Sequence, residues 1–318
     1  MLNRALLEWP LVIATIVIFG TAGFVLFSTS IDRGDLSAVT TCMSPVWRLL
    51  GVITLLASPL VFLNVVAEMA TVSWRAALPL MPEVFAETHA GRVWEWFLPI
   101  ALLLFLTAFI PIRPFIRVTI LFTLAGVLLF LRALLSHAID KGIAAIIVYF
   151  IHEAGAGLWI GSLLVLWIVA KRSQAPYGWI EDAARMVSKV AFWSVVAIVI
   201  SGIYAAYNGL GFSLHQLIFS AYGETLIVKV AVFAAVLAIG GYNRFWLVPH
   251  VDNSAARDGL LRNVGVESVI LVFGVLALAT LLANTPPAHG TLMNMGHSSM
   301  VMFAGEPLRR RTIRRGIR

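Results

Sequence analysis

Histidine 152 is the side chain in this sequence whose type and position most clearly suggest metal chemistry. His152 lies inside the long apolar run 143–170, with Glu153 directly beside it. Ionisable side chains inside a membrane span are costly, and each is a candidate functional group by default. An imidazole there can ligate a metal ion, or it can be a buried group that hydrogen-bonds a neighbouring carbonyl. The residue alone leaves both interpretations open.

Two further histidines stand near the ends of apolar runs. His137 comes just before the run that holds His152, and His289 follows the proline pair Pro286-Pro287 after the last run. If the runs that carry them are neighbours in space, three imidazoles converge near one surface. Such a cluster could bind Cu(I), Cu(II) or zinc, and paired histidines on facing helices can also ligate haem iron. The alternative is three unrelated surface histidines.

The C-terminal tail contains a second set of possible ligands within ten residues: Met293, Met295, His297, Met300 and Met302. Thioether and imidazole groups suit Cu(I) and do not suit hard cations. The alternative is an apolar tail at the membrane interface, in which methionine only fills space.

The composition indicates the elements that must position these side chains. The chain has 318 residues, of which 60% are hydrophobic and 12% charged, and its mean hydropathy is +0.92. Apolar runs of roughly 20 residues recur, each long enough to cross a bilayer, and the alternating pattern of a membrane barrel is absent. The fold class is therefore predicted to be all-α, a polytopic membrane protein.

The apolar runs predict a bundle of about eight transmembrane helices, with the first run retained as a span rather than cleaved. Residues 1–290 are expected to form this transmembrane domain, and residues 291–318 an extramembrane tail with a basic end. Prolines such as Pro10 and Pro59 are expected at helix ends or kinks. The predicted spans are 10–27, 46–70, 93–110, 115–135, 143–170, 184–207, 224–247 and 264–284.

The lysine and arginine residues of the short loops predict the orientation. The loops after the odd-numbered spans carry eleven of them, and the other side carries five before the tail. The larger set is expected in the cytoplasm, which places both termini outside, although six arginines after residue 308 favour the cytoplasm instead. The eleven are Arg33, Arg48, Arg113, Arg117, Lys171, Arg172, Arg185, Lys189, Arg244, Arg257 and Arg262, and the five are Arg4, Arg75, Arg92, Arg132 and Lys141.

Glycine and charged residues inside the spans suggest particular contacts. Gly157 and Gly161 form a GxxxG pair that lets another helix approach closely. Lys229 is expected to extend towards the membrane surface or to pair with a buried carboxylate such as Glu153. Glu267 is expected to pair with nearby arginines.

Several classes of function are excluded or disfavoured. The net charge of +7 resides largely in loops and in the basic tail, so it does not indicate nucleic-acid binding. A single cysteine, Cys42, excludes an intrachain disulfide. The sequence has no P-loop, GxSxG, HExxH or CxxC motif, so we expect neither an enzyme nor an ATP-driven pump.

Four motifs in order resemble the bacterial copper resistance protein D (CopD) family of inner-membrane proteins, over a core of about residues 88–289. Ser136 departs from the family pattern, in which glycine is common, and the methionine-rich tail is not a general family feature. The motifs are Ser136–Ala138 followed by His152-x6-Trp159-x-Gly161, Tyr222-Gly223-x2-Leu226-x2-Lys229, Asn243-Arg244 with Pro249, and Thr285-Pro286-Pro287 with His289.

The resemblance implies copper transfer across the bacterial inner membrane, in contact with membrane lipid and together with a periplasmic copper-binding partner of the CopC type. We expect His137, His152 and His289 to be copper ligands, and the tail methionines with His297 to capture or deliver the ion. Two alternatives remain: a cytochrome-like membrane haem protein, and a copper-delivery or assembly subunit that transports nothing. The sequence does not indicate the oligomeric state.

Overall fold

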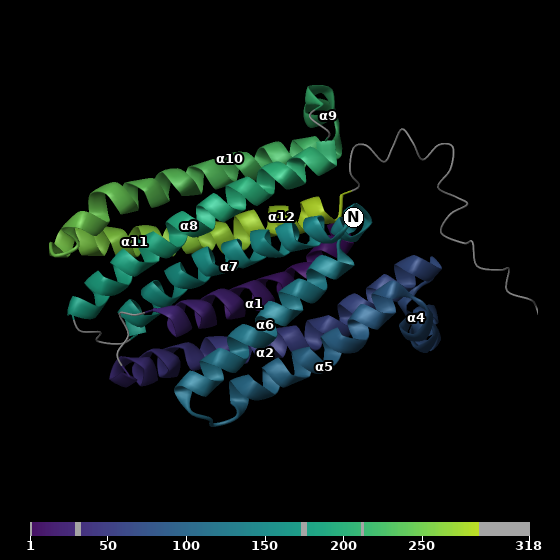
Figure 1. Cartoon of the computed structure of the whole chain (residues 1–318), viewed down its shortest axis with the longest axis horizontal. Helices are drawn as coiled ribbons and strands as arrows, with labels where there is room; N and C mark the ends of the chain where they lie inside the picture. Colours follow the sequence, from purple (N-terminus) through teal and green to yellow (C-terminus); the bar gives the residue numbers. More distant parts are fainter. Residues whose placement is uncertain (1, 29–32, 173–176, 211–212, 286–318) are drawn as a thin grey trace, which may run out of the picture.

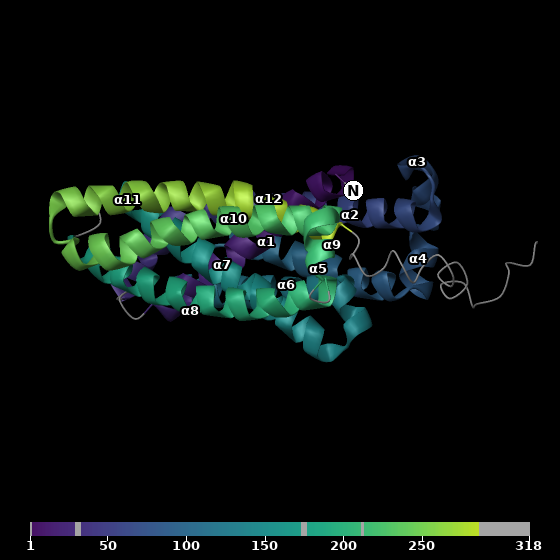
Figure 2. The same cartoon turned by 90° about the horizontal axis from the view of Figure 1, so that it is seen from above.

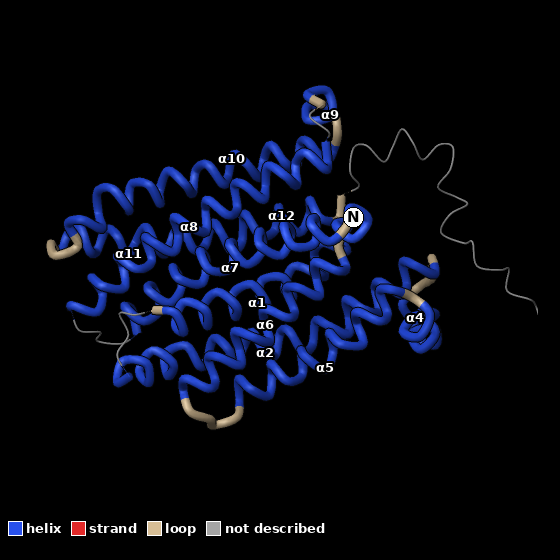
Figure 3. Tube along the Cα trace, in the orientation of Figure 1, coloured by secondary structure: helices blue, strands red, loops and turns tan. Residues whose placement is uncertain are grey.

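The computed structural model describes residues 2–28, 33–172, 177–210 and 213–285, and within them the secondary structure is helical, without strands. Figure 1 shows long helices running side by side along the length of the molecule, and Figure 3 shows short loops at several of the described connections. The all-α fold class predicted from the sequence is confirmed.

Eight helical segments of the described chain are long and apolar enough to cross a membrane, as the sequence predicted. Shorter elements join or extend them, and two of these, η3 and η5, are π-helical. The elements are α1 (Leu2–Phe27), α2 (Arg33–Ala70), α3 (Trp74–Ala77), η1 (Leu78–Leu80), α4 (Met81–Glu87), α5 (His89–Phe109), α6 (Pro114–Leu135), η2 (His137–Lys141), α7 (Ile143–Arg172), α8 (Tyr177–Leu210), α9 (Leu214–Phe219), α10 (Ala221–Tyr242), η3 (Asn243–Leu247), η4 (Val248–His250), α11 (Ser254–Val269), η5 (Ile270–Val275) and α12 (Leu276–Ala283).

Two helix starts differ from the prediction because proline does not end these helices. α1 continues through Pro10, and α2 continues through both Pro45 and Pro59. Proline removes one backbone hydrogen bond, but in packed membrane helices neighbouring groups can satisfy the freed carbonyl. The α2 helix therefore begins thirteen residues before the predicted start at residue 46, at Arg33.

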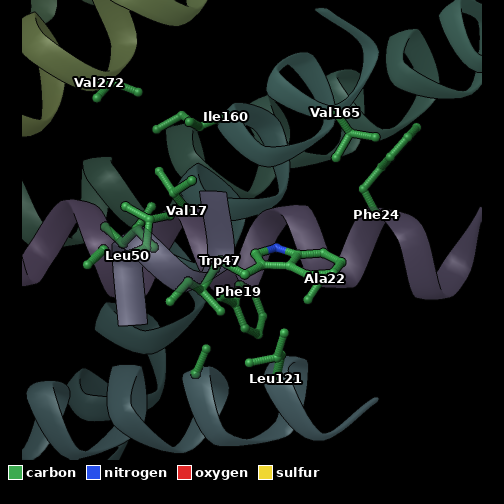
Figure 4. Close-up of a cluster of buried hydrophobic side chains, with 14 of the residues drawn as sticks. Val17, Phe19, Ala22, Phe24, Trp47, Leu50, Leu121, Ile160, Val165 and Val272 are labelled. Carbon is green, nitrogen blue, oxygen red and sulfur yellow. The ribbon is translucent and has the colours of Figure 1, made fainter. Parts of the chain in front are cut away.

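Helix α1 is the most buried span, and it packs against α2, α6, α7 and α12. Figure 4 shows the core around its middle, where the Trp47 indole from α2 lies among Val17, Phe19 and Ala22. The buried indole Nε1 of Trp47 donates to Thr21 Oγ1 at 2.9 Å, so its polar atom is satisfied within the core.

Close approach of α1 and α7 depends on glycine, as the GxxxG pair predicted. A Cβ at Gly161 would overlap the backbone of Gly20, and a Cβ at Gly20 would overlap the carbonyl of Gly157. The absence of side chains at Gly20 and Gly161 therefore allows the backbones of α1 and α7 to pack in direct contact.

The two ends of the bundle differ in what they carry. Figures 1 and 2 show the N-terminal end of α1, the last turn of α12, α4 and α9 at the same end. We call it the outer end, because the charge pattern predicts that it faces outwards. Helix α9 has exposed apolar side chains, including Leu214 and Phe219, as expected of a segment at the membrane interface.

Candidate functional site at the outer end of the bundle

His152 lies in the outer half of α7 and its ring faces α8. Its Nδ1 is 2.9 Å from Ser201 Oγ, and that hydroxyl is 2.6 Å from the carbonyl oxygen of Ala197. A hydroxyl has one hydrogen, which the short contact to Ala197 uses, so Nδ1–H donates to Ser201. In the neutral ring Nε2 then keeps its lone pair, and the backbone of Ile198 also lies within reach of the imidazole. A histidine fixed through one nitrogen, with a lone pair on the other, is arranged as a metal ligand.

Glycine leaves space beside this ring. The nearest side-chain atom to a Cβ built at Gly202 of α8 would be Cε1 of His152, at 3.6 Å. Lys229 of α10 is close enough to act electrostatically on both His152 and Glu153. The His152 ring therefore packs against α8, and the charge of Lys229 on α10 acts on it.

Glu153, the neighbour of His152, points to the other side of α7. Its Oε1 accepts from Arg132 Nη2 of α6 at 3.0 Å, and both side chains are largely buried, with 16% of Arg132 and 9% of Glu153 exposed. The second oxygen, Oε2, has no hydrogen-bond partner among the described residues. Arg132, rather than the expected Lys229, is therefore the ion-pair partner of Glu153, and Lys229 forms no ion pair in the described part of the chain.

A cavity of about 180 Å³ opens on this second side, between the outer parts of α1, α2, α5, α6, α7 and α12. Its wall includes Arg4, Glu8, Arg132 and Asn284. Asn284 Nδ2 donates to Glu8 Oε2 at 2.9 Å, and Arg4 donates to Glu8 at 2.9 Å. The first and last spans are thus joined by polar contacts at the mouth of a charged cavity.

A second carboxylate, Glu68 of α2, completes this network. Arg4 Nη1 donates to Glu68 Oε2 at 2.8 Å, and Asn64 Nδ2 donates to Glu68 Oε1 at 2.8 Å. The cavity mouth therefore has both signs of charge, so it can admit water and ions but does not by itself select an anion or a cation.

The three predicted histidine ligands do not all lie at this cavity. His152 faces α8, on the opposite side of α7 from Arg132. His137 begins η2 directly after the cavity residue Ser136, but its side chain is outside the described part. His289 comes four residues after Thr285, where the described chain ends. His289 therefore lies outside the described residues.

The remaining predicted ligands all lie outside the described residues: Met293, Met295, His297, Met300 and Met302. Among the described residues no group of three or more histidine, cysteine, aspartate or glutamate side chains is placed to hold a metal. The convergence of three imidazoles therefore stays a prediction.

Sequence reasoning missed several polar partners at this end, above all the pairs Arg132–Glu153 and Glu8–Asn284. For the first pair a signal was available, because Arg132 lies in the last turn of one span and Glu153 about three turns into the next, both in the outer half of the bundle. What was missing is which faces of the helices meet, and only the tertiary packing decides that.

The fold and the site together define a multi-pass α-helical membrane protein with polar groups gathered at one end of its bundle. Two family models match the chain: "Copper resistance protein D-like, N-terminal domain" over residues 4–145 and "Copper resistance protein D" over residues 181–282. Because the two matches cover most of the chain, it belongs to the copper resistance protein D family, and its general function is to handle copper at a membrane. The first match also includes the first ninety residues, where the sequence showed a resemblance in hydropathy only.

Two curated proteins are similar to this chain. "Inner membrane protein YebZ" of Escherichia coli (strain K12) is 27% identical over 225 residues, which are 67% of this chain and 72% of YebZ. "Copper transport protein CutJ" of Bacillus subtilis (strain 168) is 25% identical over 213 residues, which are 64% of this chain but 38% of CutJ. No solved structure matches the chain significantly.

Proposed function

We propose that this protein transports copper across the bacterial inner membrane. The observation that carries the proposal is His152 in the outer half of a membrane span, where Ser201 holds its Nδ1 at 2.9 Å and the neutral ring keeps the lone pair of Nε2 for a ligand. The family of the chain and the printed name of its relative CutJ support copper as the transported ion, and the name of YebZ supports the inner membrane.

The ion enters at the outer end in this proposal. His137 and His289 are the expected capture ligands, since each lies close in sequence to a residue of the cavity wall, Ser136 or Asn284. His152 is the expected next ligand, because it lies deeper in α7 than the outer ends that carry the other two. Few exchangeable ligands at each step suit transfer, since a very tight site would not release its ion.

A separate periplasmic copper-binding protein of the CopC type is the proposed partner at the outer end. The cavity mouth there is charged, and polar contacts with a delivering protein are expected around Arg4, Glu8 and Glu68. Charged rims steer association more than they add affinity. Copper transfer from such a protein should therefore slow as the salt concentration rises.

The test is copper movement into sealed vesicles that contain the purified full-length protein. We expect radioactive copper to accumulate or leave faster than in protein-free vesicles, and His152→Ala to abolish the difference. A protein that binds copper but moves none would contradict transport and favour the delivery or assembly alternative. A haem absorption spectrum from the purified protein would instead favour the cytochrome-like alternative, for which His152 would need a second axial ligand.

The tail is proposed to be a capture arm, and its removal is a separate prediction. Deleting residues 293–302 should lower copper capture and leave the spans folded, because the deletion follows the last span. Copper content of the purified protein and copper tolerance of cells measure the effect. A matched control deletes residues 309–318, which hold arginine but no methionine or histidine. Equal copper content in the tail deletion and the full chain would mean that the methionines only fill space.

A further inference from the structure

A second polar network lies deep in the bundle, away from the outer site. Glu267 Oε1 accepts from the indole Nε1 of Trp159 at 3.0 Å, and Glu267 Oε2 accepts from Asn243 Nδ2 at 3.1 Å. Asn263 Nδ2 donates in turn to Asn243 Oδ1 at 2.9 Å. The glutamate is 1% exposed. It lies in the middle of the span from Ser254 to Ala283. Trp159 and Asn243 belong to two other spans, so three spans contribute side chains to the network.

Within the described residues, the groups that contact this carboxylate are neutral. Glu267 forms no ion pair in the described chain, contrary to the expectation that nearby arginines would hold it. Arg244, which follows Asn243 in the chain, instead donates to Ser188 O at 2.7 Å and to Ser188 Oγ at 2.8 Å. Two neutral donors do not offset the desolvation cost of an ionised carboxylate in a membrane interior.

The other charged groups on the elements around Glu267 belong elsewhere. Lys229 of α10 lies towards Glu153 at the outer end. Lys171, Asp258 and Arg262 line a separate groove at the inner ends of α7 and α11. Within the described part of the chain, Glu267 therefore has only neutral hydrogen-bond partners, Trp159 and Asn243.

The two asparagines can serve either state of the carboxyl group. In the arrangement above, each amide donates towards a charged Glu267. If the carboxyl is protonated, its O–H can donate to Asn243, and both amides can turn over so that Asn243 donates to Asn263. Amide orientations are assigned from such networks, and both orientations have the same shape. Asn263 is partly exposed, so the chain of amides leads from the buried carboxyl towards the inner side.

The backbone is irregular on both sides of this network. Asn243 is the first residue of the π-helix η3, and the π-helix η5 begins three residues after Glu267, at Ile270. Single π-helical turns inside α-helices frequently mark functional sites, because the wider turn re-aims side chains. Gly240 leaves room beside the carboxyl, since a Cβ there would be 3.3 Å from Glu267 Oε1.

We propose that Glu267 is an exchangeable proton-binding site in the middle of the membrane and that copper movement displaces its proton. The coupling to copper rests on the proposed transport function; the proton-binding site does not. A proton on the carboxylate and a copper cation that passes nearby compete electrostatically, because each brings positive charge to the same group. When copper passes, the carboxylic O–H bond breaks, water on the inner side beside Asn263 takes up the proton, and no electrons are transferred.

Infrared difference spectroscopy of the full-length protein in lipid vesicles tests the site without copper. The spectrum of the protein minus that of Glu267→Gln should show the C=O stretch of a protonated carboxylic acid at neutral pH, shifted in heavy water. Glu153→Gln is the matched control, because Arg132 should keep Glu153 ionised and no acid band should be lost. Absence of an acid band in the Glu267 difference would overturn the proposal.

Two further measurements complete the test. Trp159→Phe removes one donor, so it should shift the acid band without abolishing it, which keeps the test valid if Glu267→Gln does not fold. Adding Cu(I) should then weaken the acid band, and Glu267→Gln should remove the pH dependence of copper movement. An acid band that copper leaves unchanged, with transport intact, would overturn the coupling. An acid band in a protein that transports nothing would refute the proposed function and leave the proton site standing.

Discussion

At the scale of single residues, the orientation of the His152 ring gives a direct prediction. His152→Ala should lower bound copper without unfolding the protein. Ser201→Ala removes the acceptor that fixes the ring, and loss of such a partner typically costs about 10-fold to 100-fold in metal affinity. Metal analysis and copper titration of the purified variants measure both effects. His215→Ala, which removes a histidine of α9 whose ring is tilted against that of Phe219, is the matched control and should change neither.

The shared-site hypothesis adds a comparison with His137. Each single substitution, His137→Ala or His152→Ala, should lower copper content, and the double variant should be little worse than either, because a shared site is lost once. Variants that lose expression or thermal stability while the remaining protein binds copper normally would show that His152 has only a structural role.

The buried ion pair of Arg132 and Glu153 predicts a pattern of stability. Arg132→Met or Glu153→Leu alone leaves a buried charge without its partner, which should cost about 3–5 kcal/mol, whereas the double variant should cost less than either. Thermal unfolding in detergent gives the comparison. The exposed pair Arg185–Glu181 is the control, with 54% and 30% of the side chains exposed, and its removal should cost at most about 1 kcal/mol. Simple addition of the two single effects would argue against the pair.

At the scale of the helices, the contact of α1 with α7 depends on the absence of side chains. Gly161→Ala should destabilise the protein by about 1–3 kcal/mol, because its Cβ would overlap the backbone of Gly20. Gly241→Ala in α10 is the matched control, since nothing lies within 4 Å of its Cβ, and it should be neutral or slightly stabilising. Unfolding midpoints of the two variants decide the matter, and equal midpoints would mean that the helices can move apart freely.

At the scale of the whole molecule, the charge pattern predicts that both termini are periplasmic. The hydrogen bond between Asn284 and Glu8 shows that the first and last spans have these residues at the same end of the bundle, but it does not show which side of the membrane that end faces. Reporter enzymes fused after Arg318 and after Arg172 should be active on opposite sides, periplasmic and cytoplasmic respectively. A reporter after Arg318 that works only in the cytoplasm would show that the tail arginines outweigh the loops.

Much of this architecture follows from local properties of the chain. Runs of apolar residues set the number and type of the spans, because an isolated backbone in lipid must form its hydrogen bonds within one helix. The same locality made the glycine pair Gly157 and Gly161 recognisable as a close helix contact. The single ionisable groups within the spans, His152 and Glu153 among them, stand out for the same reason.

The sequence by itself determined the fold class, the spans and the presence of costly polar groups inside them, because each depends on a short stretch of chain. Only the tertiary structure decided which groups meet: Glu153 with Arg132 rather than Lys229, and Glu267 with Trp159 and Asn243 rather than with arginine. The partners depend on how each helix is rotated about its own axis and on which helices lie next to one another. Both arise from the packing of side chains far apart in sequence, which no periodicity within one helix records.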